Sequence, residues 1–155
     1  MRKLNHLMVL AGLMVGLIGL SSQALAQGAP RALKGKIITS SKEIQVPTAA
    51  KGFVKKMLKQ DRAVFKKNDE GRWVIHFVAF FNRKLPAEQI GVVVLDGKKE
   101  PVAVADVAGQ KGQTTLSSQI SVDTTETPKQ KHTIQVYYPK GNKPIILAKK
   151  QIVLK

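Results

Sequence analysis

The amino-acid sequence predicts a mainly β fold, an antiparallel sandwich of about eight strands accompanied by one amphipathic helix. Three observations lead to this prediction. Short segments rich in β-branched and aromatic residues follow one another after residue 32, and turns containing Gly, Asp, Asn or Pro separate them. Apolar residues recur at helical spacing over residues 48–60. The 155-residue chain has no internal repeat and no long linker, so residues 33–155 are expected to form a single domain.

The first 26 residues have the pattern of a secretory signal peptide. A basic head at Arg2 and Lys3 precedes an apolar run over residues 7–20, and residues 24–26 supply an A-x-A cleavage pattern. The run has 14 residues, whereas a transmembrane helix needs about 20. We therefore expect cleavage after Ala26, export to the periplasm or the extracellular space, and no transmembrane segment in the mature chain.

The exported chain is expected to begin with a flexible lead over residues 27–32, followed by a strand over residues 33–40 that contains three consecutive β-branched residues. A helix is then predicted over residues 48–60, because Thr48 follows a proline and can accept a backbone N–H. Gly52 inside this helix costs about 1 kcal/mol relative to Ala, so the helix needs tertiary packing. Its apolar side consists of Ala50, Phe53, Val54, Met57 and Leu58, and its other side carries Lys51, Lys55, Lys56 and Lys59.

From residue 62 the apolar spacing changes to the period of two that is typical of strands. A short strand around Phe65, a tight turn over residues 68–71 and a long strand over residues 73–81 are predicted, and the turn is expected to pair these two strands within one sheet. Further strands are expected over residues 90–95, 102–107, 114–122, 133–138 and 145–154.

The strand over residues 73–81 is apolar on both faces, although an antiparallel sheet usually leaves one face in water. One face carries Trp73, Ile75, Phe77, Ala79 and Phe81, and the other carries Val74, His76, Val78 and Phe80. The helix over residues 48–60 is expected to cover the second face, because its own apolar side also needs a partner. If the helix lies elsewhere, Val74, His76, Val78 and Phe80 form an exposed apolar docking face.

Three features of the later strands form a common pattern: Trp73 in a central strand, the segment over residues 120–122, and the strand pair over residues 132–138 and 145–154. This pattern resembles the immunoglobulin and fibronectin type III sandwiches at the level of the fold. The resemblance implies two packed antiparallel sheets and no particular activity, since such sandwiches host many functions. The chain departs from the immunoglobulin pattern because it has no cysteine pair, no tyrosine early in the strand over residues 133–138, and a tight turn over residues 68–71.

The sequence offers no recognisable catalytic or metal-binding pattern. It has no cysteine, which excludes disulfides, thiolate catalysis and Cys-ligated metals. The mature chain contains two histidines, His76 and His132, and no third ligand at suitable spacing accompanies them. No serine lies in a nucleophile motif. We therefore expect no enzymatic activity, no catalytic residue, no metal and no cofactor, and a hydrolase with an unrecognised carboxylate pair is the third alternative.

The formal charge of the whole chain is +16, and it is spread unevenly. Residues 27–84 carry 14 basic and 4 acidic groups, residues 85–128 carry 3 and 6, and residues 129–155 carry 7 and none. If the helix and the C-terminal hairpin share one side of the fold, that side attracts anions. The candidate anion-binding residues are Lys51, Lys55, Lys56, Lys59, Lys66, Lys67, Lys149 and Lys150.

The leading hypothesis is a non-enzymatic exported interaction or structural module whose basic surface contacts lipid headgroups, acidic polysaccharide or extracellular DNA. The mature chain has 20 Lys, 4 Arg and few aromatic residues, so we expect no sequence-specific nucleic-acid binding. The alternative is an accessory subunit that docks an envelope protein through an apolar strand face or through the helix over residues 48–60. A further alternative is that the exposed lysines only keep an exported domain soluble.

Overall fold

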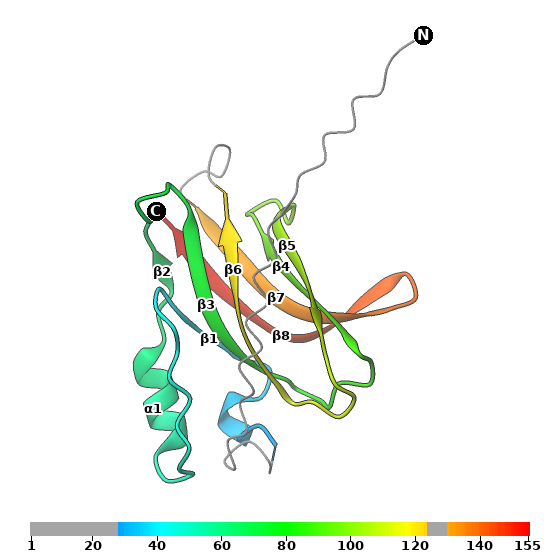
Figure 1. The fold of residues 1–155 in the computed structure, drawn as a ribbon. Helices are drawn as coiled ribbons and strands as arrows, with labels where there is room; N and C mark the ends of the chain where they lie inside the picture. Colours follow the sequence, from blue (N-terminus) through cyan, green and yellow to red (C-terminus); the bar gives the residue numbers. More distant parts are fainter. Residues whose placement is uncertain (1–27, 124–129) are drawn as a thin grey trace.

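The computed structural model describes residues 28–123 and 130–155, and the expected signal peptide over residues 1–26 lies outside them. The described chain is mainly β and forms two sheets (Figure 1). One sheet has three strands in the order β1 (Ile37–Ser40), β3 (Trp73–Phe80) and β6 (Thr115–Val122). The other has five strands in the order β2 (Val64–Phe65), β8 (Lys143–Leu154), β7 (Lys131–Lys140), β4 (Gln89–Leu95) and β5 (Pro101–Ala108). The prediction of a mainly β fold with a helix is confirmed.

The two sheets enclose a common apolar core. Trp73, Ile75 and Phe77 alternate along β3 and face this core, because successive side chains of a strand point to opposite faces. The indole N–H of Trp73 donates a hydrogen bond to the carbonyl oxygen of Lys155 at 2.9 Å. The five-stranded sheet contributes alternate residues of its strands, among them Ile90, Val92, Val94, Ile134, Val136, Ala148 and Ile152.

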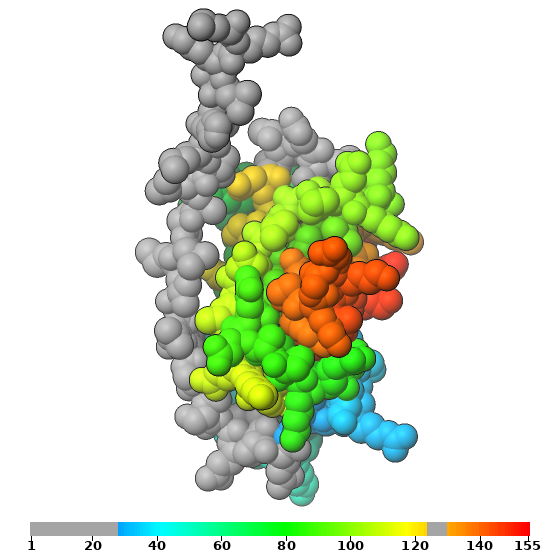
Figure 2. Space-filling view, turned by 90° about the vertical axis from the view of Figure 1, so that its right-hand side faces the viewer, coloured from blue at the N-terminus to red at the C-terminus, as the bar shows by residue number. Residues whose placement is uncertain are grey.

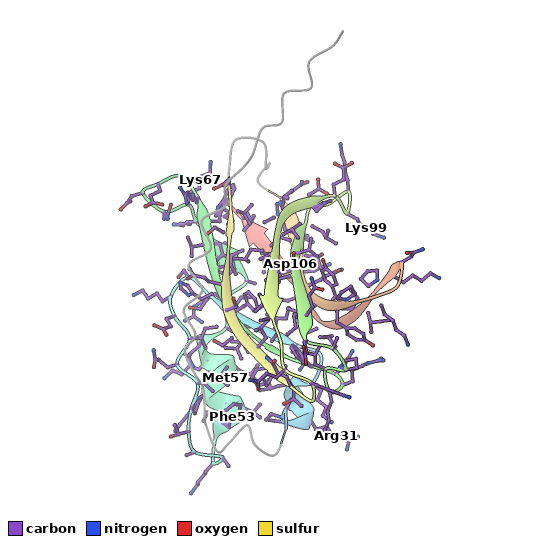
Figure 3. All side chains as sticks on the ribbon, turned by 45° about the vertical axis from the view of Figure 1, so that its right-hand side comes forward. Arg31, Phe53, Met57, Lys67, Lys99 and Asp106 are labelled. Carbon is purple, nitrogen blue, oxygen red and sulfur yellow. The ribbon has the colours of Figure 1, made fainter. Side chains whose placement is uncertain are left out.

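The helix α1 (Phe53–Gln60) covers the other face of β3. Phe53 and Met57 project from it toward the strands (Figure 3), and both are buried with Val78 and Phe80 in a second apolar cluster. The rings of Phe53 and Phe80 meet edge to face, with 6.2 Å between their centroids. Helix coverage is therefore confirmed for Val78 and Phe80.

The helix begins at Phe53, so the predicted start at Thr48 is wrong. Gly52 precedes the helix with φ of 72°, in the left-handed region that a right-handed helix does not include. Its carbonyl oxygen accepts the first helical hydrogen bond, from the N–H of Lys56 at 2.9 Å. The glycine thus turns the chain into the helix instead of weakening the helix interior.

One strand boundary and one strand pairing also differ from the prediction. The first strand begins at Ile37, because Arg31–Leu33 form a short 3₁₀ helix that places Leu33, together with Ala29 of the expected lead, in the cluster under α1. The turn over residues 68–71 joins strands of different sheets, not two strands of one sheet. The preceding strand β2 pairs in parallel with the end of β8, which places Phe65 in the common core.

Candidate functional site

Four of the predicted anion-binding residues lie together on α1 or in the turn before it. Lys51, Lys55, Lys56 and Lys59, here called the helix lysines, are exposed, and none forms an ion pair within residues 28–123 and 130–155. The helix has no acidic residue in its first turn. Lys55 and Lys59 lie four residues apart on the helix surface. Like charges at this spacing reduce the stability of a helix by about 0.2–0.5 kcal/mol. The helix lysines therefore form an uncompensated basic surface.

A shallow groove of about 450 Å³ borders this basic surface. The side chain of Gln60 holds its wall in place: its Oε1 accepts the Gln45 N–H at 2.9 Å, and its Nε2 donates to the Gln45 carbonyl oxygen at 2.8 Å. The lining consists of Gln45, Val46, Pro47, Thr48, Ala49, Lys56 and Gln60. Because no carboxylate is present in this lining, the groove adds no negative charge near the helix lysines.

Lys66 and Lys67 lie away from the helix lysines. Both are exposed in the segment after β2, and the Nζ of Lys67 lies 4.9 Å from the centroid of the Trp73 ring. Figure 3 places Lys67 at the end of the molecule opposite to Phe53 and Met57 of α1. The structure therefore does not join these two lysines to the helix surface.

Lys149 and Lys150 are adjacent in sequence but have different environments. The ammonium of Lys150 pairs with the carboxylate of Asp61, and its side chain is 14% exposed. Lys149 is exposed and follows Ala148, which faces the common core, so Lys149 points to the opposite side of the five-stranded sheet. The helix α1 covers the three-stranded sheet, whereas the β7–β8 hairpin extends away from it (Figure 1). The eight lysines thus occupy several separate places.

The apolar docking face on β3, the alternative to helix coverage, is not an open surface at Val78 and Phe80. Val78 and Phe80 are 2% and 0% exposed beneath α1, so they cannot contact another protein. Val74 and His76 remain half-buried. The apolar side of α1 packs against Val78 and Phe80, which would otherwise be exposed to water.

The second histidine, His132, is 1% exposed on β7, and its Nδ1 lies 2.8 Å from the carbonyl oxygen of Gln130. Within the described residues, no three His, Asp or Glu side chains are grouped so that they could hold a metal ion. Over the same part of the chain, the helices fall short of the length and apolar character needed to cross a bilayer.

An apolar groove that the sequence did not predict lies on the outer face of the five-stranded sheet, the side turned away from the common core. It has a volume of about 510 Å³. The tip of the β7–β8 hairpin (orange) projects from the surface beside β4 and β5 (green to yellow-green), as Figure 2 shows. The groove is lined by Val93, Leu95, Pro101, Val104, Gln135, Tyr137, Pro139, Gly141, Asn142, Lys143 and Pro144.

Two backbone features shape this groove. A β-bulge in the β7–β8 pairing lies next to Tyr137, and bulges bend the strand that contains them. The N–H of Asn82 donates to the carbonyl oxygen of Leu147 at 3.0 Å and holds the bulged segment. The Tyr137 ring lies over Gly91 of β4, where a Cβ atom would stand only 2.6 Å from the ring Cε2. Glycine is therefore required at position 91 for the ring to lie against the sheet.

A sequence signal for this groove exists. Residues 90–95 are apolar on both faces, as residues 73–81 are, so a second apolar surface beyond the core is expected from the same reasoning. In β4 the side of Ile90, Val92 and Val94 faces the core. The other side, with Val93 and Leu95, lines the groove.

Comparisons with known proteins give only distant likenesses. No family model and no curated protein sequence matches the chain. Among solved structures, a β-glucuronidase from Parabacteroides merdae is similar with a TM-score of 0.41 and 9% identity over 75% of this chain. A β-glucuronidase from Bifidobacterium dentium has a TM-score of 0.38 and 12% identity over 76% of this chain. The chain spans 14% and 16% of the lengths of these two enzymes. A likeness of this size assigns neither a fold family nor an activity to the chain.

Proposed function

We propose that this protein is a non-enzymatic exported interaction module that contacts an anionic partner through the helix lysines. The observation that carries the proposal is the absence of any carboxylate partner for these four exposed ammonium groups within residues 28–123 and 130–155. A surface with several unpaired charges of one sign attracts the opposite charge over distances of about a Debye length. Of the eight lysines predicted from the sequence, the proposed basic site contains four: Lys51, Lys55, Lys56 and Lys59.

The chemistry of lysine defines the class of partner. An ammonium group is a hydrated point charge without the planar fork of arginine, so it suits dispersed anions better than base-specific contacts. Anionic lipid headgroups, acidic polysaccharide and extracellular DNA share this chemistry. Their common feature is a dense row of phosphate, sulfate or carboxylate groups.

We also propose a cellular location and a fold type for the protein. The pattern over residues 1–26 supports export to the periplasm or beyond it, where such anionic surfaces are accessible. The two sheets with their common core support an immunoglobulin-like arrangement as the scaffold of the module.

The experiment compares two triple variants with the same change in charge. In the first, Lys51, Lys55 and Lys59 are replaced by Gln; in the second, the exposed Lys98, Lys99 and Lys111 are replaced by Gln as a control. Each protein is eluted by salt from an acidic-polysaccharide matrix, from immobilised DNA and from vesicles with anionic lipid. The helix variant should elute at clearly lower salt than the control on at least one matrix. Equal elution of the two variants on every matrix would mean that only net charge matters, and would overturn the proposal.

An accessory subunit that docks a protein through α1 is the second candidate. Leu58 on α1 is 47% exposed, which favours this candidate because the other large apolar residues of the helix contribute to packing. The dependence of binding affinity on ionic strength distinguishes the two functions. Apolar docking responds weakly to ionic strength, and binding at the electrostatic site responds strongly. Replacing Leu58 by Ser should reduce protein docking and leave salt-dependent anion retention unchanged.

A further inference from the structure

The exposed side of α1 combines an apolar strip with a basic strip. Val54 is half-buried and Leu58 is exposed, and their four-residue spacing makes them neighbours on the helix surface. Lys55 and Lys59 have the same spacing and lie one position further along the chain, so the two strips run side by side. The opposite side of α1 is buried against β3, and both strips are therefore turned away from the body of the protein.

Leu58 is one of few large apolar side chains on the surface. Among the described residues, three such side chains are exposed: Leu58 at 47%, Val64 at 49% and Val104 at 60%. Leu58 is the one that lies on α1 among the helix lysines, whereas Val64 and Val104 lie on strands of the five-stranded sheet. A single exposed leucine is ordinary on a protein surface, and its meaning here comes from the charges around it.

The charges around Leu58 have one sign. Residues 44–60 contain the four helix lysines and no acidic residue. Arg62 is exposed, and its guanidinium group lies at the end of the helix, where it donates to the carbonyl oxygens of Lys59 and Asp61 at 3.2 and 2.8 Å. The carboxylate of Asp61, the first after the helix, pairs with Lys150. The apolar strip is therefore bordered by cations and not by mixed charges.

We propose that α1 lies on the surface of an anionic lipid bilayer, with the helix lysines at the headgroup phosphates and Leu58 at the boundary of the acyl chains. This inference rests on the proposed anion-binding function and selects one of its three classes of partner. A bilayer offers anionic headgroups and an apolar layer next to each other, whereas the charged surface of DNA or of an acidic polysaccharide offers an exposed leucine no such layer. Long lysine side chains keep their ammonium groups among the headgroups while the apolar strip lies deeper.

Binding to vesicles tests the proposal. The purified protein, Leu58→Ser and the control Val104→Ser are each titrated with vesicles of equal parts phosphatidylglycerol and phosphatidylcholine. Leu58→Ser should bind about three- to tenfold more weakly than the wild type, because nearly half of the leucine surface is still in water before binding. Val104→Ser should bind as the wild type does, and elution of Leu58→Ser from DNA and from acidic polysaccharide should not change. Both replaced residues are exposed, so the melting temperatures should stay the same.

A variant with increased affinity tests the same contact from the other direction. Leu58→Trp should bind the anionic vesicles more tightly than the wild type, because tryptophan favours the region between headgroups and acyl chains. Its fluorescence emission should move to shorter wavelength when these vesicles are added. The native Trp73 is 1% exposed, so the change reports on position 58.

Failure of the lipid contact can be told apart from failure of the proposed function. Equal vesicle affinity of the wild type and Leu58→Ser would overturn the lipid contact, as would retention of the wild type by DNA or polysaccharide without binding to vesicles. A Leu58→Ser variant that also loses retention on DNA and polysaccharide would overturn it too, because the leucine would then not act through lipid. The proposed function is decided separately, by the elution of the two triple lysine variants.

Discussion

Asp61 and Lys150 form an ion pair that joins the end of α1 to the middle of β8. The same carboxylate oxygen of Asp61 accepts the backbone N–H of Thr39 at 2.9 Å, and Thr39 belongs to β1 of the other sheet. The carbonyl oxygen of the next residue, Arg62, accepts hydrogen bonds from the Thr39 hydroxyl and from the Lys150 ammonium. This polar junction therefore connects the helix and both sheets at one edge of the molecule.

The junction should contribute to stability. Replacing Asp61 by Asn leaves the partly buried ammonium of Lys150 without its counter-charge, so the free energy of unfolding should fall by about 1–3 kcal/mol. Denaturant unfolding of the two single variants Asp61→Asn and Lys150→Met and of their double variant measures the coupling between the side chains. Arg72→Gln is the control, because the ion pairs of Arg72 are exposed and should contribute less than about 1 kcal/mol. Additive effects of the two junction variants would contradict an energetic coupling.

Gly52→Ala distinguishes the observed helix start from the predicted one. In a helix that begins at Thr48, the alanine would stabilise the protein by about 1 kcal/mol. With φ of 72° at position 52, it should instead destabilise the protein by about 1 kcal/mol, since a side chain is strained in the left-handed region. Nothing lies within 4 Å of the added Cβ, so the effect is purely one of the backbone. Urea unfolding gives the sign directly, and a gain in stability would place Gly52 inside the helix.

Gly91→Ala should displace the Tyr137 ring from the sheet. The added methyl group overlaps the ring, so we expect a loss of about 1–3 kcal/mol in the free energy of unfolding and a changed near-ultraviolet circular dichroism. In a chain that also carries Tyr137→Ala the methyl group meets no ring, and the same substitution should cost far less. An equal cost in both backgrounds would show that the ring does not lie over Gly91.

Much of the strand pattern could be predicted because it depends on local alternation. Strands β3, β4 and β7 lie at or within two residues of their predicted positions, and the apolar second face of β3 correctly indicated a covering helix. The assignment of β2 failed for a nonlocal reason. A tight turn suggests a hairpin, but β2 pairs instead with the end of β8, about 90 residues later in the chain, and Phe65 is buried there in the common core.

The candidate site was predicted only in part. Four lysines on one side of a helical pattern are visible in the sequence, because helical spacing alone brings them together. The apolar outer side of β4 is visible in the sequence, but the shape of the groove depends on a bulge and on a glycine beneath a tyrosine 46 positions away, and neither relation is encoded by neighbouring residues.

By itself, the sequence determined the number and spacing of the charges, the strand-rich composition and the amphipathic helix, since each of these depends on residues within a few positions of one another. Only the tertiary structure decided which charges are free. Lys149 and Lys150 are indistinguishable as neighbours in a basic stretch, yet one is exposed and the other is paired with Asp61. Successive side chains of a strand point to opposite faces, and what each one meets there is supplied by distant parts of the chain.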